Sequence, residues 1–171
     1  MIQGWLRSDG RKGIRNVVAV AYLVECAHHV ARRIVDKADD PDVQLIGFPG
    51  CYPNAYAAKV MEAIATHPNV GGLVIVSLGC ESFNREKLRA VVEASGRPAE
   101  LLVIQEKGGT AATIAAGLEA VDRGIIGHRH EANRIIWIRT CLRLPCVRKT
   151  VSRSTWMFRR SFTFQRLKHR K

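Results

Sequence analysis

Apolar and polar positions follow one repeating pattern along the first 124 residues of the chain. Four short runs, almost wholly apolar and rich in β-branched residues, are each followed by a segment with apolar residues at helical spacing. The runs predict strands over residues 16–24, 43–48, 71–78 and 100–105. The segments after them predict helices over residues 27–38, 54–66, 84–95 and 110–123. Continuous apolar runs are typical of strands that are buried on both faces.

Strand and helix alternate at a spacing that favours right-handed crossovers between parallel strands. The sequence therefore predicts an α/β fold: a doubly wound, flavodoxin- or Rossmann-like parallel sheet of about four strands, with helices on both faces. By analogy with flavodoxin-like sheets, we expect the strand order 2-1-3-4. Asn54 is a good N-cap for the second predicted helix, and Gly124 is expected to end the fourth.

Charge divides the chain into two parts. The whole chain has 27 Lys/Arg and 15 Asp/Glu, but residues 1–124 hold 14 of each, so the net charge of +12 belongs to residues 125–171. These last residues show no sustained period of a strand or helix, except that residues 135–138 are apolar enough for an added edge strand. We predict an α/β domain over 1–124 and a basic irregular tail over 125–171.

Two interpretations of the tail remain open. Its interleaved aromatic and cationic residues are typical of an arm that binds nucleic acid. Alternatively, it is the out-of-frame end of a truncated gene, which the loss of periodicity and the jump in charge at one point favour. Under the second interpretation the tail binds nucleic acid only non-specifically.

Cysteine content and the amino-terminal sequence indicate a compartment. Five cysteines in a chain whose start lacks an apolar signal segment predict a reducing cytoplasm. No apolar stretch reaches the roughly 18 residues that a membrane helix needs, so we expect no membrane association.

Three cysteines follow three successive predicted strands. Cys26, Cys51 and Cys80 each come just after an apolar run, and the carboxyl ends of parallel strands meet at one edge of a sheet, where ligands bind. Soft thiolates suit iron, iron–sulfur clusters or zinc. Cysteine is also a common buried residue, so the pattern leaves packing open as the alternative.

Other residues that can carry chemistry also follow the strands. His28 follows the first predicted strand and Glu81 the third, so an imidazole and a carboxylate are added to the thiols at this edge, although either could be a solvated surface residue. Gly108, Gly109 and Thr110 open the fourth helix, where backbone amides favour an anion such as a carboxylate. The same turn could simply cap the helix.

Several short motifs carry a resemblance to a known family. Residues 4–16, GWLRSDGRKGIRN, are close to the opening G-[YF]-x-R-x-D-G-R-x-G-x-R-N of the altronate and galactarate dehydratases, which are bacterial sugar-acid lyases. The further matches, in the family's order, are Cys26-Ala27, Gly50-Cys51, His67-Pro68-Asn69-Val70, Gly79-Cys80-Glu81 and Gln105-Glu106-x-Gly108-Gly109-Thr110. The resemblance extends from residue 2 to about residue 122.

The resemblance implies a hydro-lyase that removes water from a sugar acid and yields a 2-keto-3-deoxy acid. It implies ferrous iron, an iron–sulfur cluster or another divalent metal, with Cys26, Cys51 and Cys80 as ligands. Glu81 or His28 would act as the base. Arg11 and Arg15, with Asn16, would position the substrate carboxylate, and Gly108, Gly109 and Thr110 would contribute amides.

The chain also departs from the family pattern. Family enzymes continue into a further large domain, so we expect a truncated homologue that is inactive without its missing C-terminal domain or a small subunit. Many relatives have a histidine just before the second cysteine, where this chain has Phe48-Pro49. Alternatives are a subunit of the related sulfolactate sulfo-lyases, or a basic module that binds nucleic acid or a partner protein.

Overall fold

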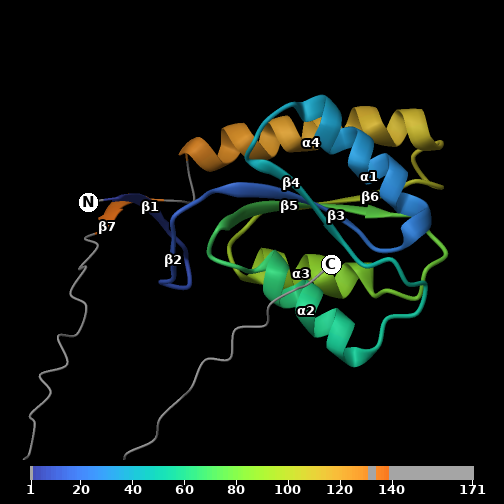
Figure 1. Ribbon diagram of the computed structural model, residues 1–171, viewed down its shortest axis with the longest axis horizontal. Helices are drawn as coiled ribbons and strands as arrows, with labels where there is room; N and C mark the ends of the chain where they lie inside the picture. The colour runs from blue at the N-terminus through green and yellow to red at the C-terminus, as the bar shows by residue number, and fades with distance from the viewer. Residues whose placement is uncertain (1, 131–133, 139–171) are drawn as a thin grey trace, which may run out of the picture. The chain divides into compact units, whose positions relative to one another are not determined.

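The computed structural model of the protein describes residues 2–130 and 134–138. Its larger sheet has four parallel strands in the order β4-β3-β5-β6 (Figure 1). In chain order the strands are β3 (Val17–Tyr22), β4 (Val43–Gly47), β5 (Val70–Ser77) and β6 (Ala99–Val103). The predicted parallel sheet is confirmed, and so is the predicted order 2-1-3-4.

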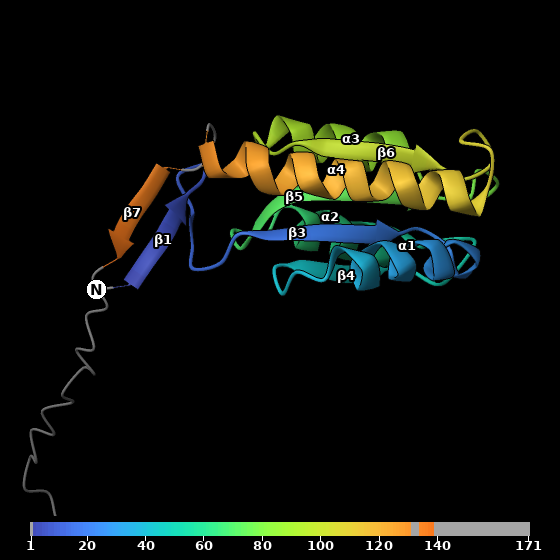
Figure 2. The ribbon, with the colours of Figure 1, turned by 90° about the horizontal axis from the view of Figure 1, so that it is seen from above.

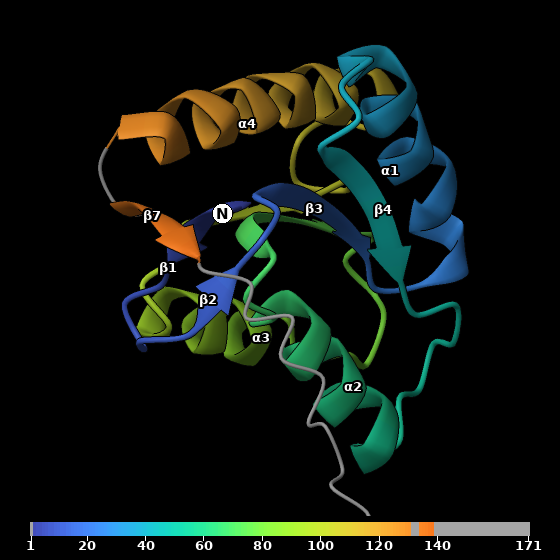
Figure 3. The ribbon, with the colours of Figure 1, turned by 60° about the vertical axis from the view of Figure 1, so that its left-hand side comes forward.

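Helices cover both faces of this sheet. They are α1 (Glu25–Ala38), α2 (Ala55–Ala65), α3 (Arg85–Ala94) and α4 (Thr110–His130). Helices α1 and α4 lie side by side on one face, and α2 and α3 lie on the other (Figures 1 and 3). This confirms the doubly wound α/β architecture.

The core has one layer on each face of the sheet, because neighbouring residues of a strand point to opposite faces. Val18 and Val20 of β3 pack towards α1 and α4, whereas Ala19 and Ala21 pack towards α2 and α3. Each fully buried valine or leucine in these layers contributes about 1.5–3 kcal/mol relative to an exposed one. Strands buried on both faces explain the apolar runs of the sequence.

Local signals set most helix ends. The side chain of Asn54 caps α2 by accepting a hydrogen bond from the Ala57 amide at 2.8 Å, as predicted, and Asn84 caps α3 in the same way. The predicted end of the fourth helix at Gly124 is wrong, because α4 continues to His130. One glycine inside a helix costs only about 1 kcal/mol, which is too little to end a helix by itself.

A second, antiparallel sheet has the order β2-β1-β7. It consists of β1 (Ile2–Leu6), β2 (Lys12–Gly13) and β7 (Arg134–Ile138), and Figure 2 shows β1 beside β7. The added strand predicted at residues 135–138 is therefore present. The rest of the predicted tail, residues 139–171, lies outside the described residues, and the division of the chain after residue 124 stays a prediction. Among the described helices, none is long and apolar enough to cross a membrane.

Candidate functional site

The loops that follow β3, β4 and β5 are joined by backbone hydrogen bonds. The Glu25 amide donates to the Pro49 carbonyl at 3.1 Å, and the Ser82 amide donates to the Cys51 carbonyl at 3.0 Å. The arrows of β3 and β6 point to this edge of the sheet (Figure 2), and β4 and β5 run parallel to them. The structure thus makes one continuous rim of the three segments that carry these cysteines: the first turn of α1 with Cys26, and the loops after β4 and β5 with Cys51 and Cys80.

The three cysteines are exposed on this carboxyl edge as free thiols. Their soft sulfur donors suit iron or zinc, and the loops that carry them adjoin. Within residues 2–130 and 134–138, however, no three or more Cys, His, Asp or Glu side chains are grouped as metal ligands. As placed, the side chains do not form a metal centre, and the ligand assignment stays a prediction.

Beside Cys80, a chain of hydrogen bonds fixes the Glu81 carboxylate. The buried Ser77 hydroxyl at the end of β5 donates to Glu81 Oε1, and the Gly79 amide donates to Oε2 at 2.9 Å. Arg85, the first residue of α3, donates from Nη1 to the Ser77 hydroxyl at 3.2 Å. Its Nη2 lies 3.8 Å from Glu106 Oε1.

Competing effects act on the pKa of Glu81. Partial burial raises it, but the hydrogen bonds from Ser77 and Gly79, with the nearby Arg85 guanidinium, outweigh burial and leave the pKa below its ordinary value. Glu81 is therefore ionised at neutral pH. It can accept a proton or contact a cation.

His28 lies in the first turns of α1, close to the end of β3. Its ring packs against Tyr22 with the ring centroids 4.9 Å apart, and its Nδ1 lies 3.4 Å from Glu25 Oε1. Gly47 leaves room for the Tyr22 ring, because a Cβ at that position would overlap it. The side chain of His28 is 40% exposed, so its imidazole can meet a substrate at this edge.

The turn before α4 is built from glycines in a left-handed conformation. Gly108 and Gly109 have φ of 85° and 99°. The Gly109 amide donates to the Ile104 carbonyl at 3.0 Å, and the Gly109 carbonyl accepts from Thr113. These bonds support the capping interpretation of the turn. Thr110 begins the helix at the carboxyl edge.

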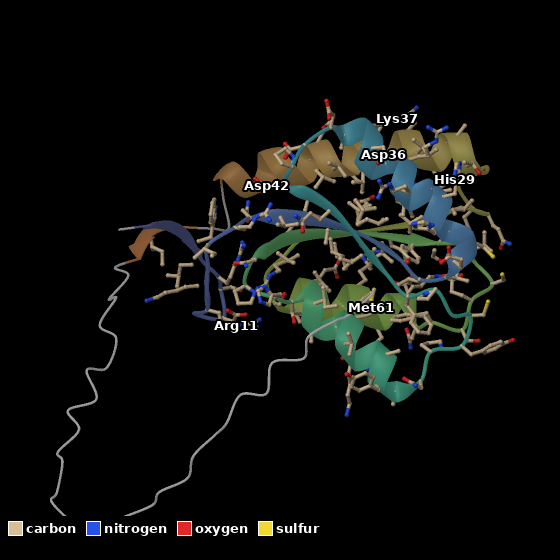
Figure 4. The ribbon with its side chains drawn as sticks, in the orientation of Figure 1. Arg11, His29, Asp36, Lys37, Asp42 and Met61 are labelled. Atoms are coloured by element: carbon tan, nitrogen blue, oxygen red, sulfur yellow. The ribbon has the colours of Figure 1, made fainter. Side chains whose placement is uncertain are left out.

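The predicted carboxylate-binding residues Arg11, Arg15 and Asn16 lie at the opposite edge of the sheet. Figure 4 labels Arg11 where the strands begin and His29, the neighbour of His28, where they end. Arg11 binds the Asp9 carboxylate through Nε and Nη2, at 2.9 and 2.7 Å. Arg15 pairs with Asp42 just before β4, at 3.0 Å. The structure therefore does not bring these arginines to the cysteine loops.

Two further arginines at this amino edge are buried. Arg7, 3% exposed, donates to the Pro68 carbonyl at 2.6 Å and to Asn16 Oδ1 at 2.9 Å. Burial, with the neighbouring Arg97, lowers the pKa of Arg7 to about 10. Arg97 donates to the Val70 carbonyl at 2.9 Å. These cations join the segment before β3 to the loops before β5 and β6.

A cavity of about 470 Å³ lies between α2 and the sheet, also towards the amino edge. Its wall is mostly apolar, with Val17, Ile46, Val60 and Val70 among the lining residues. Arg15, Gln44, His67 and Asn69 also line it. None of the three cysteines, Glu81 or His28 is among the lining residues, so this cavity is separate from the groups at the carboxyl edge.

Sequence reasoning missed Ser77 and Arg85. A polar residue at the end of the otherwise apolar β5 was a usable signal for Ser77.

A comparison with protein families matches residues 4–127 to the family described as "D-galactarate dehydratase/Altronate hydrolase, second domain". Neither the curated proteins nor the solved structures gave a match.

Proposed function

Because the chain belongs to the D-galactarate dehydratase/altronate hydrolase family through the family's second domain, we propose that it supplies part of the site where a sugar acid loses water. The product would be a 2-keto-3-deoxy acid. The family match over residues 4–127 is the observation that carries the proposal. We place the site at the carboxyl edge, because Glu81, His28 and the three cysteines are there.

The reaction needs a base for the proton next to the carboxylate and groups that stabilise the resulting enediolate-like charge. We propose Glu81 or His28 as that base. The hydrogen bonds to Glu81 support its role in two ways: they fix its orientation and keep it ionised. A lowered pKa also makes Glu81 a weaker base, and the exposed imidazole of His28 is the other candidate at this edge.

We also propose ferrous iron, an iron–sulfur cluster or another divalent metal as the cofactor, with Cys26, Cys51 and Cys80 as ligands. When bound, such a metal stabilises negative charge on the substrate and helps a hydroxyl to leave. Metal analysis after anaerobic purification, with and without the triple Cys→Ser substitution, tests this assignment. Equal metal content in the wild-type and the triple-variant protein would rule out the three cysteines as metal ligands.

A further domain or a small subunit is proposed to complete the site. This proposal is supported by the exposed residues at the carboxyl edge. Besides the three thiols, Tyr52 and Tyr56, in and near the Cys51 loop, are 83% and 77% exposed. Large exposed aromatic residues are enriched where proteins meet partners. On this proposal the chain binds substrate by itself but turns it over only with its partner.

Calorimetric titration of the anaerobically prepared chain with D-galactarate and D-altronate tests the proposed function, with Fe²⁺ present and 3-sulfolactate and duplex DNA as comparison ligands. We expect saturable binding of a sugar acid, and none of the uncharged polyol galactitol. Tighter binding of 3-sulfolactate would favour the sulfo-lyase alternative. Sequence-specific DNA binding at physiological salt, without sugar-acid binding, would favour the basic module.

A further inference from the structure

A sugar acid at the carboxyl edge needs a cation there for its carboxylate. Arg11 and Arg15 cannot meet this need as placed, because both lie at the amino edge and already pair with Asp9 and Asp42. Arg85 lies at the carboxyl edge instead. It extends from the start of α3 between the ends of β5 and β6, where Ser77 and Glu106 contact it.

The two sides of the Arg85 guanidinium have different surroundings. Nη1 is held by the buried Ser77 hydroxyl at 3.2 Å, which anchors one end of the group. Nη2 faces Glu106 at 3.8 Å, beyond hydrogen-bond distance, and the Glu106 side chain is 70% exposed. A weak ion pair with an exposed partner is easily exchanged for another carboxylate. The side chain of Arg85 is itself 26% exposed, so a ligand can reach it.

We propose that Arg85 binds the carboxylate of the sugar-acid substrate, in place of Glu106. This assignment rests on the proposed function and names the residue that would orient the substrate in that site. Ser77 contacts both Arg85 and Glu81, so one buried hydroxyl sets the spacing between them. The acidic C–H bond of the substrate is next to its carboxylate, so a carboxylate held by Arg85 presents that proton towards Glu81. A planar guanidinium matches a carboxylate with two parallel hydrogen bonds.

On this assignment Glu106 competes with the substrate carboxylate for Arg85. Removing the charge of Arg85 should therefore weaken substrate binding, and removing the charge of Glu106 should strengthen it. Calorimetric titration of the full chain with D-galactarate should show binding at least about tenfold weaker for Arg85→Ala, because a charge-assisted bond is lost. Arg85→Lys should fall between this variant and wild type. Glu106→Gln should bind more tightly than wild type.

Matched controls are available on the same helix. Arg89 and Glu93 of α3 pair with each other at 2.8 Å and have no contact with Ser77 or Glu106. Arg89→Ala and Glu93→Gln change the net charge by the same amounts as the test variants, and both should bind D-galactarate like wild type. Thermal melting of each variant verifies that it is folded.

Three outcomes decide the matter. Wild-type binding that persists unchanged in Arg85→Ala overturns the assignment and leaves the proposed function standing. Weaker binding in Glu106→Gln than in Glu93→Gln also overturns it, because Glu106 would then help to hold the ligand. No binding of D-galactarate or D-altronate by wild type overturns both the assignment and the proposed function.

Discussion

The two edges of the parallel sheet hold their charged residues in different ways. At the amino edge, buried arginines donate to backbone carbonyls, as Arg7 does to Pro68 and Arg97 does to Val70. At the carboxyl edge, the three thiols and Glu106 are exposed, and the side chains of Ser77, Glu81 and Arg85 are linked through the Ser77 hydroxyl, with the Gly79 amide as a further donor to Glu81.

This difference indicates that the two edges have different roles, one in stability and one in ligand binding. Buried charges joined to backbone hold segments of the chain together, and removing one leaves carbonyl groups without partners. Exposed groups held by neighbouring side chains add less to stability and stay accessible to a ligand. The amino edge is therefore expected to determine stability, and the carboxyl edge to carry the chemistry.

The largest effect is expected at Arg7. Arg7→Ala removes hydrogen bonds to Pro68, Asn16 and Arg15 and should lower the free energy of unfolding by about 3 kcal/mol. Arg11→Ala, at the same edge, breaks an exposed pair with Asp9 and an exposed hydrogen bond to the Thr66 carbonyl, and should cost about 1 kcal/mol. Urea unfolding of both variants makes the comparison, and equal losses would show that burial does not decide how much an arginine at this edge stabilises the fold.

A substitution at Gly47 should have an intermediate effect on stability. It should also change the site, because Gly47 contacts the Tyr22 ring, which packs against His28. In Gly47→Ala the new methyl group overlaps the Tyr22 ring, which must shift together with His28 packed against it. Overpacking of this kind costs about 1–3 kcal/mol. Thermal melting measures the loss, and the NMR signals of His28 report the movement of its ring. Unchanged His28 signals would show that Tyr22 does not position it.

Glu81 should affect stability in a pH-dependent way. Its pKa is lowered in the folded protein, so the ionised carboxylate contributes stability above its unfolded-state pKa, and that contribution is lost as the pH falls through the folded-state value. Glu81→Gln should thus be less stable than wild type at neutral pH. The difference in the free energy of unfolding between the two proteins should shrink towards pH 3. Urea unfolding across this range tests it, with Glu93→Gln as the control. A difference that grows in acid would contradict the prediction.

The three cysteines should have the smallest effect. Their side chains are exposed, so Cys26→Ser, Cys51→Ser and Cys80→Ser should each change the free energy of unfolding of the metal-free protein by no more than about 0.5 kcal/mol. Ser77→Ala, at a buried position of the same edge, should cost about 1–2 kcal/mol because it removes a hydroxyl that two side chains share. A large loss from any cysteine variant would indicate a packing role.

The sequence predicted the parallel sheet because strands buried on both faces, such as β3 and β5, must be apolar throughout. It also predicted which residues follow those strands. Arg15 and Asn16 come just before β3, so the direction of the chain already predicts that they lie at the amino edge. Arg85 was harder to find, because its role depends on Ser77 and Glu106, which come from two other segments of the chain.

Weak local signals account for the remaining differences. Gly124 was expected to end a helix, but its propensity penalty is small beside the hydrogen bonds of the continuing α4. The strand β1 was not predicted, because its pairing with β7 comes from the other end of the described chain. Pairing between distant segments cannot be deduced from a local period.

The pairing of β1 with β7 also sets an order of events during protein synthesis. Ile2 is made before the parallel sheet, but its partner Ile138 is made only after the whole of it. At about 5–20 residues per second, β1 waits on the order of ten seconds with only the two-residue β2 beside it. A strand edge left unpaired for so long is a site for aggregation, so the nascent chain needs either a chaperone at β1 or a low local concentration of its own copies.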